Sequence, residues 1–275
     1  MRISVFGEAM VEFDSDFNRS IAGDTLNVSA VTAFLGAETT YYMRIAEDIF
    51  ISDYKKVFQT LPLRTYVIES SGNNGVYFIK NKDNGERLFQ YYRKNSAASY
   101  LKYDDLPNDF YDCDLIFNSG ITAAISETCR DAVLKTFKEA KTKGIKTAFD
   151  CNYRASLWEI EKAHAFLKEL IPYIDILFLS EDDLDVLKDL KHSFTVLRKG
   201  MLGSEVSTDG ESKNYPALNV QAVDTTGAGD AYAGAFLKEF MDSNDIDKAA
   251  SFATKIASLQ VQTKGGLPSS EIAHA

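Results

Sequence analysis

Cysteine is scarce in this chain of 275 residues, and the few cysteines follow no pattern. They are odd in number, and none stands in the Cys-x-x-Cys spacing of metal and redox sites: Cys113, Cys129 and Cys151. A disulfide framework needs paired cysteines, and a structural zinc site needs clustered ones. The sequence therefore argues against a disulfide-bonded domain and against a zinc-bound domain, and we expect a reducing compartment.

Long hydrophobic runs are missing as well. Residues 1–7 resemble a short strand rather than a signal peptide, and no run of about 18 apolar residues occurs. We therefore expect a cytoplasmic protein with no membrane partner. Hydrophobic residues nonetheless make up 45% of the chain, enough for the core of one large α/β domain or two small ones.

Positive charge is in deficit. The chain has 30 lysines and arginines against 40 aspartates and glutamates, and its formal net charge is -10. Nucleic acids and anionic membranes are bound by basic surfaces, so we expect no general affinity for either. A negatively charged substrate would need a few arginines gathered locally.

Two common phosphate-handling motifs are also absent. The chain contains neither Gly-x-x-x-x-Gly-Lys-Ser/Thr nor His-Arg-Asp, which excludes P-loop and protein-kinase mechanisms. The histidines belong to no metal or triad pattern and are expected at the surface or in packing: His164, His192 and His274. Any phosphate chemistry in this chain therefore uses another arrangement.

What the chain does have is an alternation of short apolar runs with longer helical patterns. It predicts strands at 2–6, 114–117, 146–150, 174–179 and 194–197, and helices at 126–141, 158–170, 228–241 and 247–260. Such alternation is typical of βαβ units around a parallel sheet, in which ligands bind beyond the carboxyl ends of the strands. Polar residues gather at those ends, at 119–120, 150–154, 180–183 and 199–200.

Between residues 61 and 93 the pattern becomes that of a strand hairpin, with runs at 75–80 and 86–93 on either side of 83–85. A three-residue turn places Tyr77 across from Tyr91 with Arg93 on the same face, whereas a two-residue turn pairs Tyr77 with Tyr92. Exposed tyrosines beside an arginine suit a lid that closes over a polar ligand. Spacing alone favours tyrosines that merely pack in a half-buried hairpin.

The most informative stretch is 223–237, where a glycine turn leads into an apolar helix. Gly227 and Gly229 allow close backbone approach, so that amides at the helix start can point at one oxyanion. Asp230 follows them and is suited to take a proton from a hydroxyl that attacks a phosphoryl group held by those amides. An ordinary acidic helix cap is the other interpretation of Gly-Ala-Gly-Asp by itself.

Three weaker signals accompany this stretch. Asp24 opens a helical pattern that stops at Gly36, and by itself it is best interpreted as a helix N-cap. Arg154 follows a strand end, where polar residues are often functional, although a surface ion pair is the other reading. The turn at 198–203 joins glycines to cations that suit phosphates, and an ordinary hairpin turn fits equally well.

The run Asp224-Thr225-Thr226-Gly227-Ala228-Gly229-Asp230, followed by small residues and Phe236, closely resembles the second signature of the ribokinase-like (PfkB) sugar kinases. The resemblance extends from 7–8 through 23–27 to 264–266, and within the family it is closest to the 2-keto-3-deoxygluconate kinases. It implies a three-layer α/β/α fold with a mostly parallel central sheet, as one catalytic domain over 1–275. It also implies a small β-sheet lid formed mainly by about 11–22 and 65–95.

The resemblance assigns a role to each motif residue. Asp230 is the base, with the anion hole at Gly227, Ala228 and Gly229. The sugar ligands are Gly23, Asp24, Asn27, Tyr77, Tyr91, Arg93, Arg154 and Asp230. The ATP ligands are Ser180, Lys199, Gly200, Gly203, Thr225, Gly227 and Gly229. Asp183 binds Mg²⁺ through water, and Glu181 and Asp182 could substitute for it.

Several residues depart from the family pattern. Ala22 and Ala46 replace glycines, Ser180 replaces Asn and Asp183 replaces Glu, and the chain is shortened between 48 and 65. The magnesium site and the lid geometry are the features that these changes affect.

The expected activity is ATP-dependent phosphorylation of 2-keto-3-deoxygluconate to its 6-phosphate, by a homodimer that associates through the lid. Two arginines in an acidic protein favour this sugar acid over neutral fructose. A fructokinase or other neutral-sugar kinase shares every catalytic feature. A non-catalytic kinase-like binding protein is the alternative hypothesis outside the enzymes. Loss of Asp230 or of the glycines would favour it, yet all of them are present.

Overall fold

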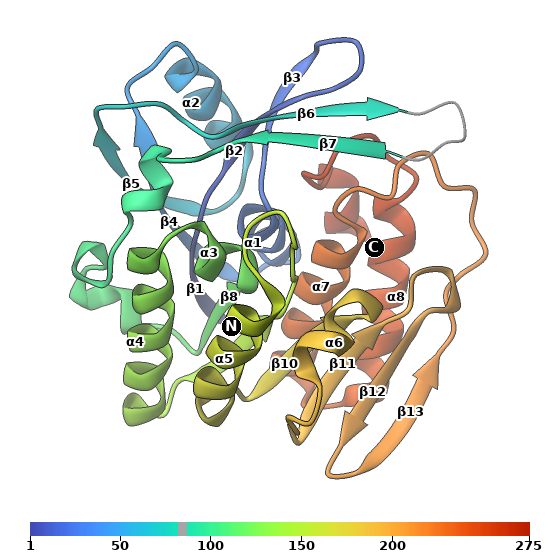
Figure 1. Cartoon of the computed structure of the whole chain (residues 1–275). Coiled ribbons are helices and arrows are strands. Elements are labelled where there is room, and N and C mark those ends of the chain that lie inside the picture. Colours follow the sequence, from blue (N-terminus) through green and yellow to red (C-terminus); the bar gives the residue numbers. More distant parts are fainter. Residues whose placement is uncertain (82–86) are drawn as a thin grey trace.

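A nine-stranded sheet forms the centre of the protein, which the computed structural model describes over residues 1–81 and 87–275 (Figure 1). The strand order is β13-β12-β11-β10-β9-β8-β1-β4-β5. Strands β5 to β11 in this order run parallel, and β12 and β13 at one edge run antiparallel. The strands are β1 (Arg2–Phe6), β4 (Glu38–Ala46), β5 (Arg64–Ser70), β8 (Leu115–Ser119), β9 (Lys146–Asp150), β10 (Ile176–Ser180), β11 (Phe194–Arg198), β12 (Ser204–Thr208) and β13 (Glu211–Tyr215).

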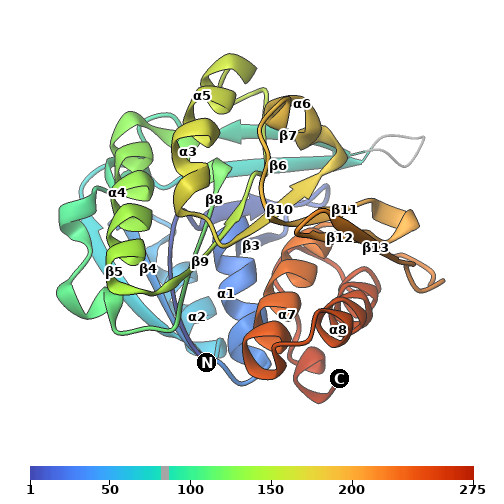
Figure 2. The same cartoon turned by 90° about the horizontal axis from the view of Figure 1, so that it is seen from below.

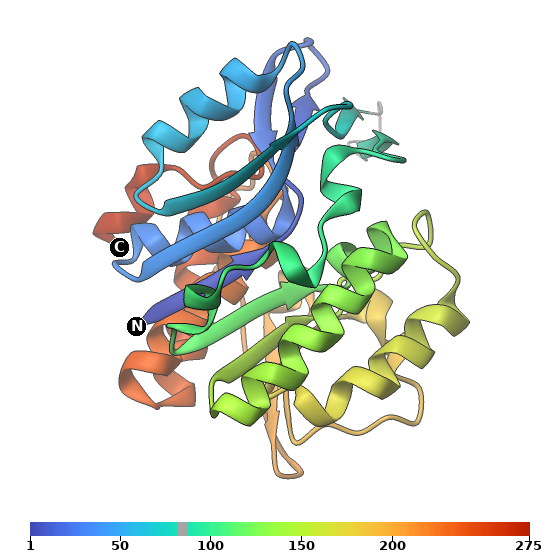
Figure 3. The same cartoon turned by 90° about the vertical axis from the view of Figure 1, so that its left-hand side faces the viewer.

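Helices cover both faces of this sheet and make three layers, as Figures 2 and 3 show. One layer contains α1 (Asp24–Phe34), α2 (Ile51–Thr60), α7 (Ala228–Ser243) and α8 (Ile246–Gln260). The other contains α3 (Gly120–Ile125), α4 (Glu127–Lys143), α5 (Ile160–Leu170) and α6 (Leu184–Leu187). Short 3₁₀ turns connect these elements: η1 (Ala97–Tyr100), η2 (Tyr103–Asp105), η3 (Asn108–Tyr111), η4 (Ile171–Tyr173), η5 (Glu181–Asp183), η6 (Gly200–Leu202) and η7 (Ser270–His274).

The central strands are apolar runs because both of their faces are buried. All five residues of β8 are buried, as are the first four of β10. A parallel sheet covered by helices on both sides requires this pattern. Each face of the sheet therefore has its own hydrophobic core.

The approach of α7 to α1 positions the site. A Cβ atom on Gly234 would lie 2.9 Å from the Val31 side chain, so glycine permits the two helices to pack closely. Ala231 and Ala235, on the same stretch of α7, are also buried. This packing brings the first turn of α7 against α1.

A second, smaller sheet has the strand order β3-β2-β6-β7 and lies across the top of the molecule in Figure 1. Its strands are β2 (Met10–Phe13), β3 (Arg19–Ala22), β6 (Val76–Asn81) and β7 (Arg87–Tyr92). In it Tyr77 pairs with Tyr91, as the three-residue turn predicts. The turn at 83–85 itself lies outside the described residues.

The predicted strands and helices are confirmed, with ends that shift by one or two residues. The strands at 2–6 and 146–150 agree fully with β1 and β9. One boundary was wrong: residues 65–70, expected in the lid, belong to β5, which pairs in parallel with β4. Within the described ranges, no helix is long and apolar enough to cross a bilayer.

Candidate active site

A cleft of about 960 Å³ lies between the small sheet, the first turns of α1 and α7, and the carboxyl ends of central strands. Most residues that the sequence proposed for the site line this cleft together: Gly23, Asp24, Asn27, Tyr77, Tyr91, Arg93, Arg154, Ser180, Gly200, Thr225, Gly227, Gly229 and Asp230. Four proposed residues are not part of its lining: Ala228, Lys199, Gly203 and Asp183. The fold therefore gathers in one place residues that are up to about two hundred positions apart.

The first turn of α7 has the geometry of an anion cradle. Gly227 adopts a left-handed conformation with φ of 75°, and a Cβ atom there would lie 2.3 Å from the Gly266 carbonyl oxygen. The amide of Ala228 donates to the Thr225 carbonyl at 3.3 Å. Among the described residues no backbone carbonyl accepts from the amides of Gly229 and Asp230, which are therefore suited to an anionic oxygen.

Asp230 stands beside this cradle and faces α1. Asn27 Nδ2 donates to its Oδ2 at 2.8 Å. Burial, reinforced by the negative charge of Asp24, raises the pKa of Asp230 to about 7, although the Asn27 hydrogen bond acts in the opposite direction. A carboxylate with a pKa near neutrality is well matched to general base catalysis.

Asp24 is the first residue of α1, and the N-cap is Gly23. The interpretation of Asp24 as the cap is therefore wrong. Its side chain instead accepts hydrogen bonds from Ser119 Oγ and, at 3.2 Å, from Asn152 Nδ2. Gly23 is required because a Cβ atom there would lie 2.3 Å from the carbonyl oxygen of Glu8.

Two aromatic side chains enter the cleft from the small sheet. The rings of Tyr77 and Tyr91 lie 5.5 Å apart. Tyr77 is buried, and its hydroxyl donates to the buried carboxylate of Glu12. The description of both tyrosines as exposed was therefore wrong, because Tyr77 is buried and Tyr91 is half-buried, and both pack in the small sheet while lining the cleft.

The two arginines proposed for the substrate have different surroundings. Arg93 forms an ion pair with Glu8, whose side chain is 1% exposed and also accepts from Ser96 Oγ at 2.6 Å. Arg154 is exposed and donates to the Tyr153 carbonyl at 2.9 Å. Within the described part of the chain no carboxylate forms an ion pair with Arg154. Arg154 therefore keeps a positive charge available to the cleft.

The lysine expected to face the phosphates, Lys199, is engaged away from the cleft. Lys199 Nζ forms an ion pair with Glu205 at 2.6 Å and donates to Asn214 at 3.3 Å. Gly203 has φ of 95°, and a Cβ atom there would lie 2.0 Å from the Tyr215 carbonyl oxygen. Both residues shape the β11–β12 turn, and Gly200 is the residue of that turn that reaches the cleft.

Asp183 is fully buried and holds the loop after β10. Its Oδ1 accepts from the Tyr153 amide at 2.7 Å, and its Oδ2 accepts from the amide and hydroxyl of Ser180, both at 2.6 Å. The neighbouring Asp182 lines the cleft. Over the described residues, no three His, Cys, Asp or Glu side chains are grouped to hold a metal ion.

Three buried carboxylates hold neighbours of the cleft: Glu8, Glu12 and Asp150. Sequence reasoning gave no role to Glu8 or Glu12, and it placed Asp150 only among the polar residues at a strand end. Glu8 directly follows Gly7 at the end of β1, and Asp150 ends β9. The strand-end positions of Glu8 and Asp150 were a usable signal, whereas Glu12 lies within β2, and the partners of these carboxylates come from other segments. Arg198, which was noted as one of two cations near a glycine turn, proves to be the partner of Asp150.

Comparison with known proteins agrees with this geometry. A family model described as "pfkB family carbohydrate kinase" matches residues 4–273. The chain belongs to the pfkB family. It is therefore a carbohydrate kinase, and its three-layer fold with a small second sheet is that of this family.

Relatives of this pfkB kinase differ in the sugar that their names specify. The chain is 29% identical to a 2-dehydro-3-deoxygluconokinase from Dickeya dadantii (strain 3937), over 297 residues that cover 96% of each protein. It is 27% identical to probable fructokinase-5 from Arabidopsis thaliana, covering 96% of this chain and 92% of that protein. Among solved structures, an uncharacterized sugar kinase from Pyrococcus horikoshii in complex with ATP superposes with a TM-score of 0.87 at 24% identity, covering 99% of each chain.

Proposed function

We propose that this kinase transfers the γ-phosphoryl group of ATP to the terminal hydroxyl of 2-keto-3-deoxygluconate, which is also called 2-dehydro-3-deoxygluconate. The product is the 6-phosphate. The observation that carries this proposal is the exposed guanidinium of Arg154 on the same cleft as Asp230 and the first turn of α7. A sugar acid has a carboxylate at one end for Arg154 and a terminal hydroxyl at the other end for Asp230.

Arg154 is the better of the two arginines to bind the substrate carboxylate. A guanidinium offers a planar fork of donors that matches a carboxylate, and that of Arg154 has no carboxylate partner within the described residues. Arg93 already neutralises Glu8, so its part in binding is to hold the small sheet over the cleft and to add a donor. Tyr91 lies within reach of the charges of both arginines.

The transfer step uses the other end of the cleft. The terminal hydroxyl oxygen attacks the γ-phosphorus, the bond from that phosphorus to the oxygen of ADP breaks, and the hydroxyl proton passes to Asp230. The amides of Gly229 and Asp230 face the charge on the transferring group, and stabilisation of this kind contributes several kcal/mol. Asn27 orients the Asp230 carboxylate through its hydrogen bond at 2.8 Å.

The residues present fit ATP with its magnesium ion. A Cβ atom at Gly227 would collide with the Gly266 carbonyl, so glycine is needed for the left-handed turn that begins the cradle, and a protein of the same fold is solved with ATP. Mg²⁺ commonly keeps several waters and binds through one or two carboxylates together with phosphates. Asp182 is placed for such a contact, whereas Asp183 would act through the loop that it holds. When bound, the ion would neutralise phosphate charge.

A direct comparison of substrates tests this proposal. ATP consumption is measured with each sugar at the same Mg²⁺ and enzyme concentrations. We expect kcat/KM to be at least about tenfold higher for 2-keto-3-deoxygluconate than for fructose, because one charge-assisted contact contributes about 1.5–3 kcal/mol. A preference for fructose would reject the carboxylate role of Arg154 while leaving the kinase chemistry intact.

Fructokinase activity is the second candidate, because one observation favours it. Arg93, which a sugar-acid site would use as a second cation, is held by Glu8, and a probable fructokinase is among the relatives of similar identity. The same substrate comparison separates the two candidates.

We further propose that two copies associate through the outer face of the small sheet. Phe13 and Phe78 stack there with ring centroids 5.1 Å apart, and Tyr92 packs edge-on against Phe78. Tyr92 is 61% exposed and Leu88 49% exposed, although both lie on this apolar face of an edge strand. Exposed edges and apolar patches of this kind are commonly covered by a partner.

Light scattering checks this association. We expect the mass of two chains for the unmodified protein and of one chain for Tyr92→Glu, because a charge would enter the apolar contact. Tyr100→Glu is a matched control, since Tyr100 is 57% exposed but lies outside the small sheet. Monomer alone in the unmodified protein at micromolar concentration would contradict the proposal.

A further inference from the structure

We propose that Arg198 is a positioning residue for phosphoryl transfer, whose guanidinium holds the first turn of α7 and places a buried positive charge beside Asp230. This inference rests on the proposed role of Asp230 as the base. It adds to that role Arg198, which the sequence indicated only as one of the cations of the 198–203 turn.

The guanidinium of Arg198 joins three elements at once. Its Nη1 and Nη2 donate to the two oxygens of Asp150, at the end of β9, at 2.8 and 2.7 Å. Its Nη1 also donates to the carbonyl of Gly229 at 3.1 Å, and its Nε to the carbonyl of Leu179 at 3.3 Å. Because both nitrogens are bound by the carboxylate of Asp150, the guanidinium is fixed in orientation. It therefore holds the carbonyl of Gly229, and with it the cradle, in place.

Packing supports the same assignment. A Cβ atom on Gly229 would lie 3.0 Å from Arg198 Nη1, so a side chain at this position would push the guanidinium away from the helix. The second glycine of the cradle therefore serves the approach of Arg198 as well as the approach of a phosphate. The side chain of Arg198 is 13% exposed and lines the cleft, whereas that of Asp150 is 2% exposed.

The charge of Arg198 acts on Asp230 together with charges from the other elements around it. Asp24, on α1, and Asp150, on β9, raise the pKa of Asp230, whereas Arg198, on β11, and the hydrogen bond from Asn27 lower it. Tyr77, on β6, also faces the charge of Asp230. Arg198 and Asp150 thus act in opposite directions, so removing one or the other should move the titration of Asp230 in opposite directions.

Three variants separate geometry from charge. Arg198→Lys keeps the charge and loses the fork, Asp150→Asn removes the negative partner, and Asp150→Asn with Arg198→Gln removes both charges without leaving a buried ion unpaired. The last variant guards against a failure to fold. Each is assayed for kcat/KM against pH with 2-keto-3-deoxygluconate and ATP, or with fructose if that is the sugar consumed.

We expect the wild-type kcat/KM to rise with pH and level off above about 7, because Asp230 must be deprotonated. Arg198→Lys should keep this midpoint within about half a unit and lose about 10- to 100-fold in kcat, since small displacements of a reacting group have such effects. Asp150→Asn should move the midpoint down by about half a unit or more, and the double variant should move it back up relative to Asp150→Asn.

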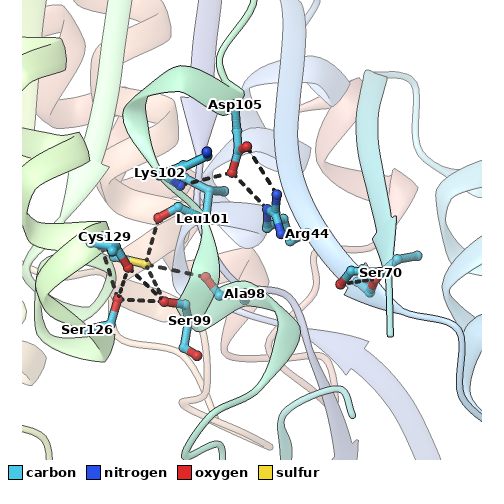
Figure 4. Close-up of polar contacts among 11 residues, drawn as sticks. Arg44, Ser70, Ala98, Ser99, Leu101, Lys102, Asp105, Ser126 and Cys129 are labelled. Carbon is cyan, nitrogen blue, oxygen red and sulfur yellow. Dashed lines mark hydrogen bonds and ion pairs between the residues drawn. The ribbon is translucent and has the colours of Figure 1, made fainter. Parts of the chain in front are cut away.

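A matched ion pair away from the cleft provides the control. Arg44 Nε and Nη2 donate to the two oxygens of Asp105 at 2.8 and 3.1 Å, in the same forked geometry (Figure 4). Neither residue lines the cleft. Arg44→Lys should lower the thermal midpoint of unfolding and leave the pH midpoint and kcat unchanged.

The outcomes distinguish this inference from the proposed function. Wild-type kcat in Arg198→Lys together with an unmoved midpoint in Asp150→Asn would overturn the role of Arg198, while an inactive Asp230→Asn in the same series would leave the base assignment standing. A near-normal Asp230→Asn would instead remove the base itself.

Discussion

Asp230→Asn lowers turnover by about 10²- to 10⁴-fold, which is the usual contribution of a general base. The amide cannot take the proton of the attacking hydroxyl, but it has nearly the same shape and still offers an oxygen to Asn27 Nδ2. Binding of ATP should therefore be almost unaffected. Steady-state kinetics give the loss in kcat, and calorimetric titration with ATP gives the dissociation constant.

Stability measurements show that this loss is not unfolding. The pKa of Asp230 is raised in the folded protein, so its contribution to stability is present below the unfolded value near 3.8 and is lost as pH rises through about 7. Asparagine has no such pH dependence, and the unfolding midpoint of Asp230→Asn at pH 8 should equal or exceed that of the wild type. Asp245→Asn, at the start of the neighbouring α8, is the matched control and should keep its kcat.

Arg154→Ala raises the KM for 2-keto-3-deoxygluconate by about 10- to 100-fold with a smaller change in kcat. The lost contact is a charge-assisted hydrogen bond between the guanidinium and the substrate carboxylate, which contributes about 1.5–3 kcal/mol. Because fructose has no carboxylate, its KM should not change. Initial rates with both sugars at saturating ATP measure the effect.

Two further variants make this second test specific. Arg154→Lys keeps the charge but loses the planar fork, so its KM should fall between those of Arg154→Ala and the wild type. Arg64→Ala removes an exposed arginine on β5 that is not part of the cleft and should leave KM unchanged. An unaltered KM for the sugar acid in Arg154→Ala would show that another group binds the carboxylate.

The residues of the cradle illustrate what local sequence predicts well. Gly227, Gly229 and Asp230 lie close together at the start of α7, so the turn and the helix start that carry them are local features of the sequence, whereas Asn27, Arg198 and Gly266, which contact them, come from distant segments. Strands such as β9 and helices such as α8 were predicted for the same reason, since hydrophobic periodicity is a property of neighbouring residues. The pairing of Tyr77 with Tyr91 is one of two registers that the alternation along the adjoining strands left open, since a two-residue turn would have paired Tyr77 with Tyr92.

Individual side chains show where that reasoning ends. Lys199 was expected to face phosphate and pairs with Glu205, while Asp183, proposed for the metal, has both oxygens occupied by the loop that it holds. Residues 65–70 have the composition of a small-sheet strand, but their pairing with β4 places them in the central sheet. In each case the partner lies on another element.

The sequence by itself determined the family, the order of strands and helices, and the cradle with its carboxylate, because these depend on residues close together in the chain. Only the tertiary structure decided which charges remain available: Glu8 neutralises Arg93, Asp150 neutralises Arg198, and Arg154 faces the cleft without an ion pair within the described residues. The physical reason is that β1, β9 and β11 become neighbours of one cleft through the strand order of the sheet. Coulomb interactions depend on those distances in space, which the linear order of residues does not contain.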